Sequence, residues 1–233
     1  MTSTGQSQAE HGGSPLLPDD PRRAGLIDLL GALAYGELSA FERMASDSRM
    51  APNLGDRTAL AALAAGEFAH FQQLCQYLSS LEADPEYAMA PYVVALDTFH
   101  DLTAPADWLE SLVKAYVGDG IAGDFYREVS AYLDPESRAL VRTVLGDAGH
   151  AAFAVDRVRA AIAADPTIGG RLALWARRLV GEAFTQAQRV VVEREGLVAL
   201  IASGASDLAE IGKLFERVID GHSERMRSLG LSE

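Results

Sequence analysis

The sequence has few of the features that mark secreted or membrane proteins. It contains one cysteine, Cys75, so no disulfide can form within the 233-residue chain, which fits a reducing compartment. Its start is rich in Gly, Ser, Gln and Pro and lacks a basic segment followed by an apolar one, unlike a signal peptide. No apolar run reaches the roughly 18 to 20 uncharged residues of a membrane helix. We therefore expect a cytoplasmic protein without membrane contact, with a disordered tail over residues 1–22 and a single domain over residues 23–233.

Basic residues are also scarce. The chain carries 20 Lys and Arg against 33 Asp and Glu, a formal net charge of −13, which excludes a surface that attracts polyanions as a whole. Any contact with nucleic acid would need a local patch. The arginines of the one locally basic stretch are Arg171, Arg177, Arg178, Arg189 and Arg194. They could meet RNA phosphates, or they could form a solvated face with ion pairs such as Arg178 with Glu182.

The alternation of apolar and polar residues that marks strands is absent. Apolar residues instead recur at steps of three and four, which is the spacing of helices. Helices are predicted over residues 23–48, 56–82, 105–133, 135–164, 168–196 and 206–228. The segment between the second and third helices is long enough to cross from one end of a bundle to the other. The sequence therefore predicts an all-α four-helix bundle over residues 23–164, with a long crossover and two additional C-terminal helices.

Two stretches repeat the pattern Gly-acid-x-x-His. They are GEFAH at residues 66–70 and GDAGH at residues 146–150. Glu67 and His70, three residues apart on a helix, share one face, and so do Asp147 and His150. Both pairs continue the apolar steps of their helices, so we expect them to point into the bundle.

Two further acids lie on inward faces of the other two helices. Glu37 and Glu67 are equally far from the connection between their helices, so they should lie at one depth. Asp124 continues the apolar steps of the third helix, and Glu128, one turn later, shares its face and could replace or supplement it. Asp119 is turned about 140° away from Asp124 at about 100° per residue, so we expect it to face elsewhere.

Four buried carboxylates repel one another, and two histidines cannot neutralise them even when both are protonated. Two divalent metal ions can. The predicted metal ligands are Glu37, Glu67, His70, Asp124, Asp147 and His150. The remaining histidines, His11, His100 and His222, are assigned to loops or the surface.

One acid from each of two helices, with acid-x-x-His from each of the other two, resembles the ligand set of the ferritin-like superfamily. Within it, the chain resembles the di-iron tRNA hydroxylases that act on 2-methylthio-isopentenyl-adenosine. The resemblance covers residues 23–164 and implies two iron ions, dioxygen activation, an electron donor and hydroxylation of an unactivated C–H bond. Asp124 and Asp147 depart from it, because such sites normally have Glu there.

The substrate is the least determined part of this prediction. Arg171, Arg177, Arg178 and Arg189 are the candidates for tRNA contact. The alternatives are a ferritin-like iron-binding protein or ferroxidase, and a small-molecule oxidase without a tRNA substrate. The oligomeric state stays open, with a homodimer as one option.

Overall fold

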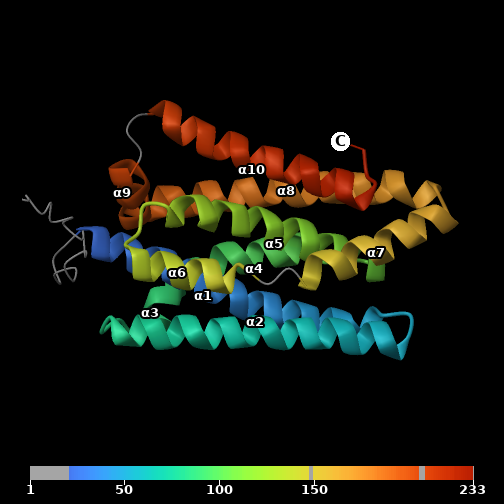
Figure 1. The fold of residues 1–233 in the computed structure, drawn as a ribbon, viewed down its shortest axis with the longest axis horizontal. Helices are drawn as coiled ribbons and strands as arrows, with labels where there is room; N and C mark the ends of the chain where they lie inside the picture. The colour runs from blue at the N-terminus through green and yellow to red at the C-terminus, as the bar shows by residue number, and fades with distance from the viewer. Residues whose placement is uncertain (1–20, 147–148, 205–207, 233) are drawn as a thin grey trace, which may run out of the picture.

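In a computed structural model, which describes residues 21–146, 149–204 and 208–232, every regular element is a helix (Figure 1). The long helices are α1 (Pro21–Asp47), α2 (Leu54–Ser80), α5 (Trp108–Ser130), α8 (Thr167–Glu193) and α10 (Leu208–Leu229). The shorter ones are α3 (Pro85–Met89), α4 (Val93–Leu102), α6 (Pro135–Val144), α7 (Gly149–Ala164) and α9 (Glu195–Gly204), with 3₁₀ turns η1 (Ser48–Met50) and η2 (Ala90–Tyr92). The all-α prediction is confirmed. The predicted tail falls largely on residues outside the described ranges, and α1 already begins at Pro21.

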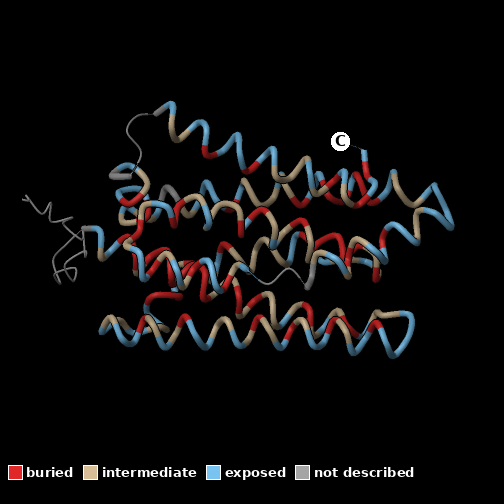
Figure 2. The backbone as a smooth tube through the Cα atoms, in the orientation of Figure 1, coloured by how far each residue is buried: buried red, intermediate tan, exposed pale blue. Residues whose placement is uncertain are grey.

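Helix α1 lies at the centre of the core. It packs against α2, α3, α5 and α9, and Leu26, Leu29, Leu30 and Leu33 are at most 2% exposed. Figure 2 shows buried residues concentrated between α1 and its neighbours, while the outer side of α2 is exposed. The segment Arg22–Met50 is long and apolar enough to cross a membrane, but 61% of its most apolar window is buried in the fold. Packing of the core accounts for its apolar character.

Side-chain caps fix where several helices begin. Asp134 accepts hydrogen bonds from the backbone N–H groups of Glu136 and Ser137, with Pro135 in the first turn, which is the predicted start. The second helix starts two residues earlier than predicted, because Asn53 caps it. Asp56, at which the sequence predicts the helix to begin, is buried and accepts a hydrogen bond from Arg157 of α7 at 2.7 Å.

Helix α2 packs mainly along α1 and is tied to the rest of the bundle near its two ends. The Asp56–Arg157 ion pair joins its beginning to α7. Near its other end, the Tyr77 hydroxyl lies 2.9 Å from the Ser137 hydroxyl of α6, within hydrogen-bond distance. These two contacts fix the ends of α2 relative to the opposite half of the bundle.

The predicted helix over residues 135–164 is wrong as a single element, because it is divided into α6 and α7. The division falls where Gly146 and Gly149 lower helix propensity, and a Cβ at Gly146 would lie 2.9 Å from the Arg142 carbonyl oxygen. The crossover is also more regular than predicted. It contains α3 and α4, because Pro85 begins a helix that Asp84 caps.

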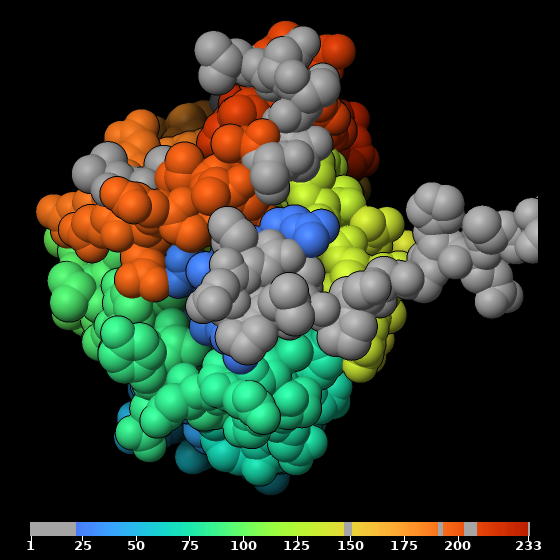
Figure 3. Space-filling view, turned by 90° about the vertical axis from the view of Figure 1, so that its left-hand side faces the viewer, coloured from blue at the N-terminus to red at the C-terminus, as the bar shows by residue number. Residues whose placement is uncertain are grey.

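The C-terminal part contains one helix more than predicted in its described residues. Helix α9 lies between α8 and α10 and packs against the N-terminal part of α1. Figure 3 shows this end of the bundle, with α9 in orange beside α1 in blue. Arg194, just before α9, pairs with the buried carboxylate of Asp28 in α1. Charge pairing and close packing therefore hold α9 against the core.

Replacing Gly31 with Ala is expected to destabilise the protein by about 2 kcal/mol. A Cβ at this position of α1 would lie 2.2 Å from the Ala88 carbonyl oxygen of α3, so the two helices would have to separate. Gly181→Ala is the matched control, because that glycine of α8 has nothing within 4 Å of its Cβ position, and it should stabilise by up to about 1 kcal/mol. Urea unfolding of both variants measures the difference. Equal stabilities would contradict the close contact at Gly31.

Candidate metal centre

Glu37 of α1 meets Glu67 and His70 of α2 inside the bundle. One ligand atom from each of the three residues lies within 4.8 Å of the others. His70 Nδ1 is 3.4 Å from Glu37 Oε2 and 3.6 Å from Glu67 Oε2. Both glutamates are buried, at 8% and 7% exposure. Within the described ranges this is the one group of three His, Cys, Asp or Glu side chains that could hold a metal ion.

The regular pairing of α1 with α2 explains why these three side chains meet. The two helices are joined by a short connection through η1 and lie side by side along their length (Figure 1). Glu37 follows the buried Leu33 by one turn, and Glu67 follows the buried Ala64. His70 lies on the same face of α2 as Glu67, because residues three apart on a helix are neighbours.

The cluster holds protons more tightly than the isolated groups would. Burial raises the pKa of Glu37 to about 9, with His70 opposing the shift and the nearby Glu67 carboxylate adding to it. The carboxylates of Glu37 and Glu67 raise the pKa of His70 to about 10, against the effect of burial. A positive charge, whether a proton or a metal ion, is therefore strongly favoured here.

The residues present fit a divalent metal ion. Glu37 Oε2 and His70 Nδ1 are buried and have no hydrogen-bond partner in the structure. Buried polar atoms are normally paired, so an unpaired acceptor and an unpaired nitrogen facing each other favour a bound cation between them. Two carboxylates and an imidazole suit iron, manganese or zinc.

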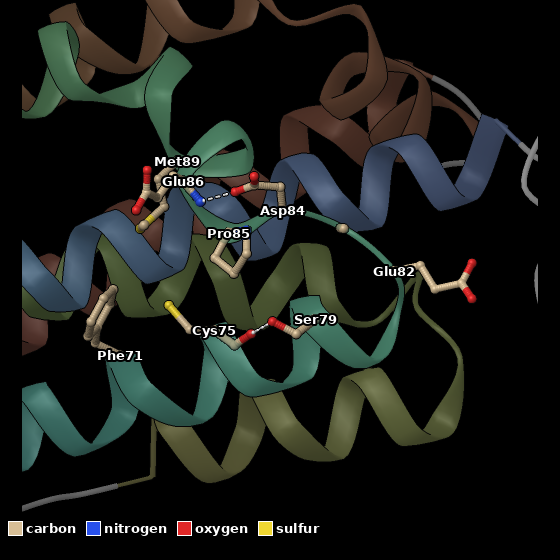
Figure 4. A pocket seen from close by; sticks show the side chains of 9 residues that line it. Phe71, Cys75, Ser79, Glu82, Asp84, Pro85, Glu86 and Met89 are labelled. Carbon is tan, nitrogen blue, oxygen red and sulfur yellow. Dashed lines mark hydrogen bonds between the residues drawn. The ribbon is translucent and has the colours of Figure 1, made fainter.

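Three aromatic side chains of α1 and α2, each close in sequence to a cluster residue, contact one another. Phe41 and Phe68 have ring centroids 5.0 Å apart, and Phe68 and Phe71 5.6 Å apart. Phe71 also lines a hollow of about 670 Å³ between the end of α2 and α3, drawn in Figure 4, where Glu82 points away from the other lining residues. None of the three cluster residues lines this hollow. It is therefore a separate feature of the surface.

The structure does not bring Asp124 to the cluster. Its carboxylate accepts hydrogen bonds from Arg225 of α10 and from Arg127, each at 2.6 Å. A Cβ at Gly221 of α10 would lie 2.4 Å from Asp124 Oδ2, so this glycine makes room for the ion pair. The alternative, Glu128, is likewise turned to α10, where it pairs with Arg217 at 2.6 Å. Both acids of α5 on this face therefore hold the last helix.

The second Gly-acid-x-x-His motif falls on the gap between α6 and α7. Asp147 lies outside the described residues. His150 belongs to the first turn of α7, and its side chain is also outside the described part. Their assignment as ligands stays a prediction from the sequence.

The sequence predicts that Asp119 of α5 faces away from the site. In the structure, Asp119 and Glu67 nevertheless interact through their charges. Burial raises the pKa of Asp119 well above its ordinary range, and the charge of Glu67 is the strongest electrostatic contribution. By its accessible surface, however, Asp119 is exposed. It lies on another side of α5 from Asp124, which faces α10. Its carboxylate is not among the ligand atoms that lie within 4.8 Å of one another, so it acts on Glu67 through its charge.

Two other sequence assignments change with the structure. His100 was assigned to a loop or the surface, but it lies in α4, and burial lowers its pKa to about 3. Of the arginines proposed for RNA contact, Arg171 pairs with Asp107 at 2.8 Å and with Glu110 at 2.5 Å. Arg178 donates to the Leu102 carbonyl oxygen at 2.5 Å. These two arginines therefore help to hold α8 against α4 and α5.

The chain was compared with known protein families and with curated proteins. A family model described as a ferritin-like domain of actinomycetes matches residues 20–204. The match includes Glu37, Glu67 and His70 and extends through α8 and α9, beyond the residues 23–164 that carried the resemblance in the sequence. Helix α10 lies outside it. No curated protein matches the chain.

Proposed function

The chain belongs to this ferritin-like domain family, and we propose that it is an iron-binding oxidoreductase that uses dioxygen to hydroxylate an apolar substrate. One observation carries the proposal: a buried group of two carboxylates and an imidazole, with an unpaired acceptor on Glu37 and an unpaired nitrogen on His70. Burying such a group without a cation costs several kcal/mol. A bound metal ion would offset this free-energy cost of burying the two carboxylates and the imidazole.

Glu37, Glu67 and His70 would hold the iron, and the charge of Asp119 of α5 would act on Glu67 from outside this group. A second iron ion would rest on Asp147 and His150, the residues of the repeated motif. Bound iron supplies the electron-transfer chemistry that dioxygen requires. The reaction also needs an external electron donor, since the chain has one cysteine and no nucleotide-binding motif of its own.

The surrounding side chains favour an apolar substrate. Leu33 of α1 and Ile121 of α5 are buried, at 2% and 8% exposure, and Phe68 follows Glu67 directly. Apolar walls exclude water and strengthen every charge interaction inside the site. In the metal-free site Glu37 and His70 each hold a proton at neutral pH, and a bound metal ion would displace these protons.

A tRNA substrate has less support than the metal centre. It rests on the sequence resemblance and on a basic stretch in which Arg171 and Arg178 already have partners inside the fold. Arg177 is exposed and Arg189 contacts Gln186, so these two are the arginines with most freedom to contact phosphate. We therefore treat tRNA as one substrate to be tested.

Protein loaded with Fe²⁺ under nitrogen should consume dioxygen when air is admitted, and a His70→Ala variant should not. The test adds a chemical reductant and either tRNA carrying 2-methylthio-isopentenyl-adenosine or a mixture of small prenyl alcohols. Mass spectrometry then looks for products that have gained one oxygen atom. Oxygen consumption with ferric mineral and without hydroxylated product would favour a ferroxidase. Absence of iron-dependent oxygen consumption would contradict the proposal.

A further inference from the structure

A recess of about 420 Å³ lies between the end of α1, the end of α4 and the beginning of α5. Its wall carries six titratable side chains: Arg43, Arg49, His100, Lys114, Asp47 and Asp101. None of the metal-cluster residues lines it. Its volume is in the range of small-molecule sites.

Lys114 forms the inner wall of this recess and is 6% exposed. Its ammonium group donates to the Thr103 carbonyl oxygen at 2.8 Å and more weakly to the His100 carbonyl oxygen at 3.4 Å. The described residues place no carboxylate within 4.0 Å of it. Burial lowers its pKa to about 8, with Asp47 the charge that most opposes the shift. A buried ammonium with two carbonyl partners still has a donor and a charge to satisfy.

His100 and Arg43 also present unsatisfied nitrogens at the recess. His100 Nδ1 and Arg43 Nε are both buried and have no hydrogen-bond partner in the structure. The imidazole is neutral, so Nδ1 can donate a hydrogen bond in the matching tautomer. Lys114 therefore has one donor beyond its two carbonyl partners, and His100 Nδ1 and Arg43 Nε have no acceptor. Such a set favours a ligand that brings oxygen acceptors and negative charge.

The two acids of the recess limit how much negative charge the ligand can carry. Asp101 is 3.9 Å from Arg43 and both side chains are largely exposed, so the pair is weak. Asp47 is more deeply set, and burial raises its pKa. The recess holds three cationic side chains, Arg43, Arg49 and Lys114, and these two carboxylates. About one further negative charge would balance them, so a monoanion is favoured over a dianion.

We propose that this recess binds a small organic anion through its carboxylate, with Lys114, His100 and Arg43 as the donors. The carboxylate would accept from Lys114 Nζ and, once their side chains turn into the recess, from the nitrogens of His100 and Arg43, and the apolar part of the ligand would lie against Met50 and Pro105. The recess and the metal cluster share no lining residue.

Metal-free protein should bind sodium propionate or sodium benzoate saturably, measured by calorimetry and by the rise in melting temperature at constant ionic strength. Arg43→Gln and Lys114→Met should each weaken this binding about tenfold or more, because each removes a charge-assisted hydrogen bond. Arg57→Gln is the matched control, since that arginine is exposed at the start of α2 and should bind the anions as the wild type does. Arg43 is 44% exposed, so its variant tests the site even if the Lys114 variant fails to fold.

A purely structural role for Lys114 makes a different prediction. If it only closes the end of α4, Lys114→Met lowers stability and Arg43→Gln changes nothing in the response to either acid. Absence of saturation in the wild type, or an unchanged response in Arg43→Gln, would overturn the proposal. Tighter binding of inorganic phosphate, titrated in parallel, would overturn the assignment of a carboxylate ligand.

Discussion

Replacing His70 with Ala is expected to lower the affinity for Fe²⁺ about 100-fold, or about 2.7 kcal/mol. His70 is the one nitrogen donor of the described cluster, and its Nδ1 lies within 3.6 Å of both carboxylates, so no neighbouring side chain can take its place. Glu67→Gln should have a similar effect, because an amide is a much weaker ligand than a carboxylate. Anaerobic titration with Fe²⁺, followed by calorimetry or a competing chelator, measures both.

The two acids of α5 provide a matched pair for the same titration. Asp119→Asn should weaken iron binding about tenfold, since an amide cannot lose a proton and gain the negative charge that the Asp119 carboxyl can gain when a cation binds nearby. Asp124→Asn should leave the affinity unchanged and lower the melting temperature, because Arg225, at 12% side-chain exposure, loses its 2.6 Å partner. The reverse order of affinities would restore Asp124 as the ligand and remove Asp119 from the site.

Metal-free protein is expected to lose stability as the pH rises from about 5 to about 10. Glu37 titrates from its ordinary pKa of 4.5 in the unfolded chain to about 9 in the fold, and His70 from 6.5 to about 10. In both cases the folded state binds the proton more tightly, so this stability is present at low pH and is lost as the pH passes through the folded pKa. Each such group adds a slope of up to about 1.4 kcal/mol per pH unit. Urea unfolding across this range measures it.

Glu37→Gln is the control for this pH dependence. An amide does not titrate, so the slope should become shallower and the metal-free variant should exceed the wild type in stability near pH 9. Metal affinity of the wild type should show the opposite trend and increase with pH, because binding displaces protons. A metal-free stability that is independent of pH in this window would mean that the carboxylates are not buried together.

Sequence periodicity predicts the half of the site that is built on two regular neighbouring helices. Glu37 and Glu67 continue apolar steps that the fold keeps, and a short connection fixes their relative depth. The same reasoning does not select the acid of α5. Asp124 faces α10, where its partner is Arg225, about a hundred residues later in the chain, while Asp119 on another side of α5 is exposed. Local spacing carries no information on which buried face meets which helix.

Periodicity also misses what the crossover does. Its prolines suggest irregular chain, but Pro85 starts a helix, and α4 follows and brings His100 to the recess beside Lys114. A propensity scale treats proline as a helix breaker, whereas its effect depends on its position in the first turn. This recess joins the crossover to residues of α1 and α5 that are distant in the sequence, so no local pattern in the sequence points to it.

The attachment of α2 at both ends restricts how the metal centre can open. Two contacts hold the ends of α2, one between Asp56 and Arg157 and one between Tyr77 and Ser137. Glu67 and His70 lie between these two contacts along the helix. The helix cannot move outward as a whole without breaking the half-buried ion pair of Asp56 with Arg157. A metal ion would therefore enter near the middle of α2, by rotation of a side chain such as Phe68 or by slight bending of the helix. A substitution that removes either contact should therefore speed the exchange of bound iron, although every metal ligand is unchanged.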